Sequence, residues 1–300
     1  MNHRFLKTIA VAFPLSVLLV LGLKFATLGR MQSQLQFSLP AADRVLVLGN
    51  SHGRDAICDS LMPGWANRCS DGEMYFGVYM LAKRMLECNK VDTLVIPMTD
   101  FVSYRDERVT TKYLLYESSR MALADGELLG QLARLNWRDV LSFYCVNDLQ
   151  AMLTPAEVGG YEHWDHHGLS AELKNLDYRL AREGKTVAPR KSLSDFTLQT
   201  HYLKRIIQLC KQKGVALVIL NYPKYERSKY FDRTRVWNYY ATLDDSVKIA
   251  DYEHFQLPDT SYFANCTHLN YRGAALFSTS ISRHGLSLQS PKQWRRTRRD

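Results

Sequence analysis

The first feature of the sequence that could do chemistry is a serine at the end of a short apolar run. Val45 to Leu48 is a continuous β-favouring run, and only Gly49 and Asn50 separate it from Ser51. Such a run is typical of a strand buried on both faces of a parallel sheet, which places Ser51 on the turn after the strand. A serine hydroxyl there could act as a nucleophile, but it could equally cap the next helix. His52 could contact a substrate or cap a helix turn.

A second reactive side chain lies near the other end of the chain. His268 lies within the stretch Phe263–Ala274, FANCTHLNYRGA. A histidine can take the proton from an attacking serine hydroxyl and return it to the leaving group. Asn265, three residues before His268, could orient the imidazole through its amide oxygen. Ser51 and His268 are therefore the candidate reactive pair.

Alternating strand and helix patterns are expected to bring this pair together. Three further runs share the β-favouring pattern: Val91–Ile96, Val215–Asn221 and Val247–Ala250. Apolar residues at helical spacing before Gly214 predict an amphipathic helix: Leu203, Ile206, Ile207 and Cys210. This order predicts an α/β fold, a three-layer α/β/α sandwich with a mostly parallel, flavodoxin-like sheet and a central first strand. The ligand crevice is then expected at the carboxyl ends of the strands.

Together, the two motifs resemble those of the SGNH (GDSL-type) hydrolase superfamily. The Gly49-Asn50-Ser51 turn is similar to its first block, and the stretch from His268 to Ala274 is similar to its last block. The resemblance is strongest to the membrane-anchored branch that modifies envelope glycans, such as the alginate acetylation and D-alanyl transfer proteins. It covers roughly residues 43 to 103 and 198 to 285.

The resemblance implies a role for each residue of the site. Ser51 would be the nucleophile and His268 the general base. Gly72 would donate a backbone N–H to the oxyanion hole, the alternative being an ordinary turn glycine. The family's third block is G-x-N-D, whereas this chain has Pro97-Met98-Thr99-Asp100. Thr99 would then donate through its hydroxyl, or the donor comes from elsewhere.

Asn265 stands where the family has aspartate, and this difference separates two functions. An amide cannot supply the negative charge that stabilises an imidazolium, and in a Ser-His-Asp protease the same change lowers turnover about ten-thousand-fold. The leading expectation is a serine-dependent esterase or O-acyl(acetyl)transferase that acts on a bacterial envelope polysaccharide. The alternative is a catalytically impaired accessory protein that binds acyl or glycan ligands without efficient turnover.

Partners and cofactors follow from the same resemblance and from the charge pattern. The expected partners are an acylated envelope glycan or acyl donor and an acyl-transferring membrane protein; no cofactor is expected. The net charge of +9 could suggest nucleic acid. The sequence lacks zinc-finger spacing, an RNP-like motif and a basic region leading into heptads. No nucleic-acid partner is therefore expected.

The N-terminus is expected to cross a membrane. Thr8 to Leu23 carries no charge and follows Arg4 and Lys7. Continuation past Lys24 gives about 20 residues, enough to span a bilayer core of roughly 30 Å. Because no convincing A-x-A-like site follows, an uncleaved signal-anchor is favoured over a cleaved signal peptide. The cationic flank predicts a single pass with a cytoplasmic N-terminus and a periplasmic main domain.

The expected organisation runs from this anchor to a basic tail. Its parts are a membrane anchor (1–30), a linker (31–42), the SGNH-like domain (43–287) with a largely helical insertion at about 102–196, and a solvated basic tail (288–300). The insertion is expected to shape the site and to contain a helix from Ser118 to Leu135.

Metal and disulfide signals are weak. Glu162 to His167 has ligand residue types, but neighbours in sequence rarely converge on one ion, so no metal is expected. The six cysteines are widely spaced without a C-x-x-C motif. Cys58 and Cys69 could pair on proximity alone, whereas Cys210 is expected to be a buried thiol.

Overall fold

The computed structural model describes residues 3–99, 121–145, 156, 158–163, 165, 197–225 and 234–297. These residues belong to two compact units. The helical unit comprises Met1–Gln36 and Glu107–Val158, and the sheet unit comprises Phe37–Asp106 and Gly159–Asp300. Each unit is described by itself.

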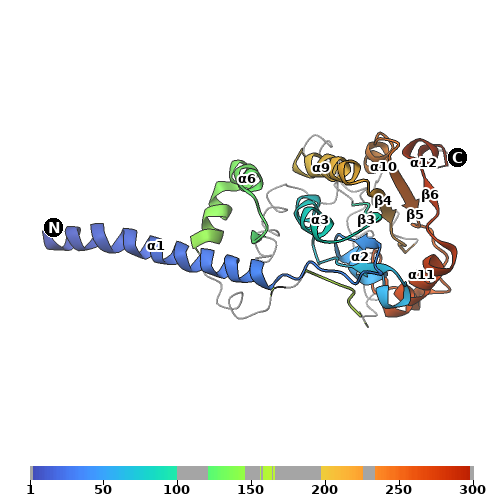
Figure 1. The fold of residues 1–300 in the computed structure, drawn as a ribbon, viewed down its shortest axis with the longest axis horizontal. Coiled ribbons are helices and arrows are strands. Elements are labelled where there is room, and N and C mark those ends of the chain that lie inside the picture. Colours follow the sequence, from blue (N-terminus) through green and yellow to red (C-terminus); the bar gives the residue numbers. More distant parts are fainter. Residues whose placement is uncertain are drawn as a thin grey trace, which may run out of the picture. The chain divides into compact units, whose positions relative to one another are not determined.

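The sheet unit contains a six-stranded sheet in its described part, with the order β2-β1-β3-β4-β5-β6 (Figure 1). The strands are β1 (Val45–Val47), β2 (Trp65–Asn67), β3 (Thr93–Pro97), β4 (Ala216–Asn221), β5 (Val247–Asp251) and β6 (Leu288–Gln289). Strands β1 to β5 are parallel, and β6 pairs antiparallel with β5. The order of the first five is that of flavodoxin-like sheets, so the predicted fold is confirmed. One detail differs, because β1 is the second strand from an edge and not central.

Helices cover both faces of this sheet and complete three layers. Helices α2 (Ser51–Ala56) and α11 (Tyr271–His284) pack together on one face, while α3 (Tyr75–Cys88) and α9 (Thr197–Lys213) pack together on the other (Figure 1). The strands are apolar on both sides because both faces are covered. Val47, Val95 and Val218 pack in the cluster that includes Phe277 of α11.

The C-terminal residues are part of the sheet unit. The expected solvated tail instead contains β6 and α12 (Pro291–Thr297). Trp294 of α12 is only 1% exposed, and its Nε1 donates to Asp251 Oδ2 at 2.7 Å. The prediction of a solvated tail was wrong because it was based on the basic residues of the segment and did not consider that Trp294 could be buried against β5. The remaining short elements are η1 (Asp59–Leu61), α10 (Thr234–Tyr240) and η4 (Thr260–Tyr262).

The helical unit contains α1 (His3–Gln34) and α6 (Gly126–Cys145). Helix α1 is long and apolar enough to cross a membrane, as expected, and it extends into the predicted linker. Helix α6 lies later than the predicted Ser118–Leu135 helix, and it is interrupted at Asn136, whose backbone is not helical. Most of the predicted insertion lies outside the described residues.

Candidate active site

The turn after β1 places Ser51 at the start of α2. Gly49 has a φ of +147°, and a Cβ at this position would lie 2.2 Å from Pro97 Cδ. Only glycine fits there without strain. Asn50 then caps α2, because its side chain accepts a hydrogen bond from the His52 backbone N–H at 3.2 Å. Ser51 is therefore the first residue of the helix and not its cap.

A tight loop before α11 holds His268. The Ala264 N–H donates to the His268 carbonyl at 3.0 Å. Asn270 caps α11 by accepting from the N–H groups of Arg272 and Gly273. A Cβ on Gly273 would lie 2.3 Å from the Tyr262 carbonyl oxygen, so the helix approaches this loop closely. The polar and glycine positions of the late motif thus fix the loop that carries His268.

Ser51 and His268 form a hydrogen bond across 217 positions of sequence. Ser51 Oγ lies 2.8 Å from His268 Nε2, and His268 Nδ1 lies 3.0 Å from Asn265 Oδ1. The backbone N–H groups of Thr267 and His268 also donate to Asn265 Oδ1, at 2.9 and 3.0 Å. These donors turn the amide oxygen toward Nδ1, which must then carry the imidazole proton. Nε2 is left to accept from the serine hydroxyl, which is the tautomer of a general base.

Two further side chains surround the His268 ring. The His52 ring stacks on it, with centroids 4.5 Å apart and an interplanar angle of 24°. Thr267 Oγ1 lies 3.0 Å from His268 Nδ1 and donates to Asn265 Oδ1 at 3.1 Å. Sequence reasoning missed Thr267, although its place beside the candidate base was a signal. The imidazole is thus held by hydrogen bonds at both nitrogens and by stacking.

The two predicted oxyanion donors lie in different surroundings. The loop after β2 that carries Gly72 is joined to the Ser51 turn, because the Ser70 N–H donates to the Gly49 carbonyl at 2.8 Å. Gly72 has a φ of +64°, which favours glycine. Thr99 is buried after β3, and its N–H donates to the Tyr240 hydroxyl at 3.0 Å. Among the described residues, Thr99 makes no hydrogen bond to the reactive pair.

A buried carboxyl one helical turn after Ser51 was not expected from the sequence. The Asp55 side chain is buried; its Oδ1 accepts from Arg54 Nε at 2.8 Å, and its Oδ2 has no hydrogen-bond partner in the described part of the chain. Burial raises the pKa of Asp55 to about 6, against the lowering effect of Arg54. An Arg-Asp dipeptide gives no sequence signal of burial, so only the fold identifies this group.

A short segment, residues 159–163, contacts the two helices that follow Ser51 and His268. The Gly160 N–H donates to the Cys69 carbonyl at 3.0 Å, and Glu162 pairs with Arg54 at 2.9 Å. The His163 ring stacks on Tyr271, the first residue of α11, with centroids 4.5 Å apart. Residues 159–163 therefore run from the end of β2, past α2, to the start of α11. Trp164, His166 and His167 of the expected polar loop lie outside the described residues.

The described residues were also expected to lack a metal site, and a disulfide was suggested for two of the cysteines. Among them, no group of three or more His, Cys, Asp or Glu side chains could hold a metal ion. All six cysteines are free thiols, so the suggested pairing of Cys58 with Cys69 was wrong. Cys210 is a buried thiol, as expected, and its burial raises its pKa to about 12.

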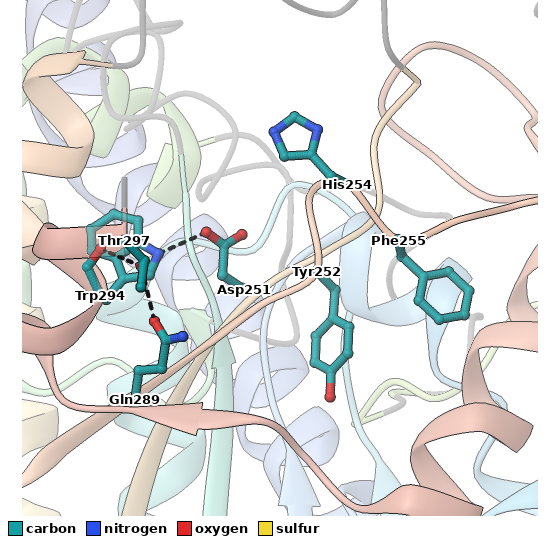
Figure 2. Close-up of a pocket in the computed structure, with 7 residues that line it drawn as sticks. All are labelled: Asp251, Tyr252, His254, Phe255, Gln289, Trp294 and Thr297. Atoms are coloured by element: carbon teal, nitrogen blue, oxygen red, sulfur yellow. Dashed lines mark hydrogen bonds between the residues drawn. The ribbon is translucent and has the colours of Figure 1, made fainter. Parts of the chain in front are cut away.

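A separate pocket of about 540 Å³ lies where β5 and β6 meet α12 (Figure 2). Its lining residues are Asp251, Tyr252, His254, Phe255, Gln289, Trp294 and Thr297. Neither Ser51 nor His268 lines it. Asp251 is engaged there by the Trp294 indole N–H and, on its other oxygen, by Asn221.

Comparisons with known proteins leave the family open. A protein-family model matches residues 170–286, which include Asn265 and His268 but not Ser51 and make up less than half of the chain. No curated protein matches the chain. A solved structure of a candidate platelet activating factor from Streptococcus pneumonia is 10% identical, and the match covers 95% of this chain and 99% of that one with a TM-score of 0.41. At that TM-score the likeness carries no argument about this chain.

Proposed function

We propose that the chain is a serine-dependent esterase or O-acyl(acetyl)transferase of the SGNH (GDSL) type. The observation that carries the proposal is the 2.8 Å hydrogen bond between Ser51 Oγ and His268 Nε2 at the carboxyl end of β1. Ligands of open α/β sheets bind at this end. The resemblance of the two sequence motifs to the SGNH superfamily supports the same assignment.

The reaction would proceed in two steps. His268 Nε2 accepts the hydroxyl proton as Ser51 Oγ attacks the ester carbonyl, and His268 then gives that proton to the departing alcohol oxygen. The resulting acyl-serine is attacked by water or by a sugar hydroxyl, again with His268 as the base. Asn265 holds the imidazole in the required tautomer, and the backbone N–H of Gly72 is the proposed oxyanion donor.

The proposed substrate is an acylated envelope polysaccharide, and the proposed place is the outer face of the cell membrane. The length and apolar surface of α1 support a single-pass anchor. The cationic residues Arg4 and Lys7 before the apolar run support a cytoplasmic N-terminus and a periplasmic main domain. The resemblance to anchored glycan-modifying proteins supports the substrate class and an acyl-transferring membrane protein as partner. Segment 159–163 would form one wall of the substrate site.

One observation favours a second function. The group that contacts His268 Nδ1 is the amide of Asn265. It cannot supply the negative charge with which a carboxylate would stabilise the positive charge that develops on the imidazole during the reaction. An accessory protein that binds acyl or glycan ligands without efficient turnover would tolerate this arrangement. The two functions differ in whether Ser51 forms a covalent adduct.

Labelling with a serine-directed fluorophosphonate tests the proposal. The full chain in detergent should be labelled, and Ser51→Ala should abolish the label. Ser142→Ala, an exposed serine of α6, is the matched control and should label like wild type. A label that persists in Ser51→Ala would mean that the nucleophile is misassigned. A folded wild type that takes no label but binds an acetylated oligosaccharide would favour the accessory function.

A further inference from the structure

The second half of α6 exposes an apolar stripe. Trp137 is 59% exposed and Leu141 53% exposed, and Cys145 is exposed as well. These residues are spaced by four, so they lie on one side of the helix. Arg138 is exposed beside them, with its guanidinium 5.5 Å from the centroid of the Trp137 ring, and Arg134 is exposed just before the break at Asn136. Neighbouring exposed apolar side chains that are rimmed by charged residues mark contact surfaces for proteins or membranes.

The end of this stripe meets α1 where the membrane-compatible surface of α1 ends. The exposed large apolar side chains of α1 run from Ile9 to Phe25. Phe25 lies against Tyr144 of α6, with ring centroids 5.7 Å apart. Lys24 is only 4% exposed, and its Nζ lies 3.7 Å from the centroid of the Phe143 ring. The C-terminal half of α6 is therefore next to the end of the apolar run, within one compact unit (Figure 1).

We propose that residues 137–145 of α6 form a second membrane contact, lying in the headgroup region of an anionic phospholipid bilayer beside α1. Tryptophan is favoured at this depth because its ring is apolar and its N–H is polar. Arginines attract anionic headgroups. The break at Asn136 separates this half from the first half of α6. The inference depends on α1 crossing the membrane and is independent of the esterase proposal.

Lipid quenching of Trp137 tests this contact in the full chain. The protein is placed in nanodiscs of phosphatidylglycerol and phosphatidylcholine, with acyl chains either plain or brominated near the headgroup. The emission of wild type minus that of Trp137→Phe is the Trp137 contribution. Bromination should lower this contribution about twofold or more, because quenching requires contact with the lipid. Substitution of both arginines (Arg134→Gln with Arg138→Gln) should weaken the quenching, whereas Glu127→Gln, at the far end of α6, should not.

Two results would overturn the inference. An equal Trp137 contribution in plain and brominated discs, with Trp137 accessible to acrylamide, would place the stripe in water. An equal contribution with Trp137 protected from acrylamide would assign the stripe to a contact with a second copy of the chain. Neither readout uses turnover, so failure here and failure of the esterase proposal are distinguishable.

Discussion

Replacement of Asn265 by aspartate should convert a weakened triad into a stronger one. The oxygen that faces His268 Nδ1 already accepts from two backbone N–H groups and from the Thr267 hydroxyl, at 2.9 to 3.1 Å. These three partners are donors, so a carboxylate oxygen at this position would accept the same hydrogen bonds. The substitution therefore changes charge and leaves geometry in place.

The size of the effect follows from the separation of the charges. A carboxylate and an imidazolium roughly 4 Å apart attract by about 4 kcal/mol at an effective dielectric constant of about 20. Because His268 is partly exposed, solvent screening reduces this to about 1.4–2.7 kcal/mol, or about 10- to 100-fold in rate. The gain is smaller than the ten-thousand-fold seen in a protease because there the amide also imposes the wrong tautomer. Here the backbone donors already fix the right one.

Hydrolysis of an aryl acetate by the full chain measures the change. The kcat/KM of Asn265→Asp should rise about 10- to 100-fold at a pH above the imidazole pKa. The added carboxylate favours the charged imidazolium, so the acid limb of the pH–rate profile should move to higher pH. Asn238→Asp adds the same charge at an exposed site on α10 and should have no effect. An Asn265→Asp rate within about twofold of wild type, with wild-type folding, would refute the reasoning, and no turnover in either form would leave only the accessory function.

Three further outcomes are expected. Burial raises the pKa of Asp55 from its ordinary 3.8 to about 6, so ionisation of this carboxyl costs stability above pH 6, and the cost falls away as the pH drops from 6 to below 3.8. Between pH 5 and 7.5, wild type should therefore lose about 1–1.5 kcal/mol of unfolding free energy relative to Asp55→Asn in denaturant titrations, and parallel curves would contradict the burial of this carboxyl. Gly49→Ala should cost about 2 kcal/mol or more and reduce fluorophosphonate labelling, while Gly130→Ala, with open space in α6, should stabilise by about 0.5–1 kcal/mol. The chain should stay with membranes after an alkaline wash, and added protease should digest the sheet unit in spheroplasts; a soluble mature protein that begins after residue 26 would mean that α1 is a cleaved signal.

Strands and helices that carry a clear apolar pattern within their own residues could be predicted from the sequence. Four of the strands and the helix before Gly214 lie close to where their apolar patterns place them, because a strand buried on both faces needs an unbroken apolar run. The flavodoxin-like order followed from the alternation of strands and helices. The strands β2 and β6 were not predicted because their residues, Trp-Ala-Asn and Leu-Gln, do not form an unbroken apolar run.

The sequence also determined the chemical types at the site, while the tertiary structure decided their contacts. Ser51, His268 and Asn265 could be named from their motifs, but the hydrogen bond between Ser51 and His268 depends on α2 and α11 packing together on one face of the sheet. The stacking of His52 on His268 and the burial of Asp55 have no local signal, because both arise from neighbours distant in sequence. Burial is what moves the pKa of a carboxyl from its ordinary value, and only the folded chain sets burial.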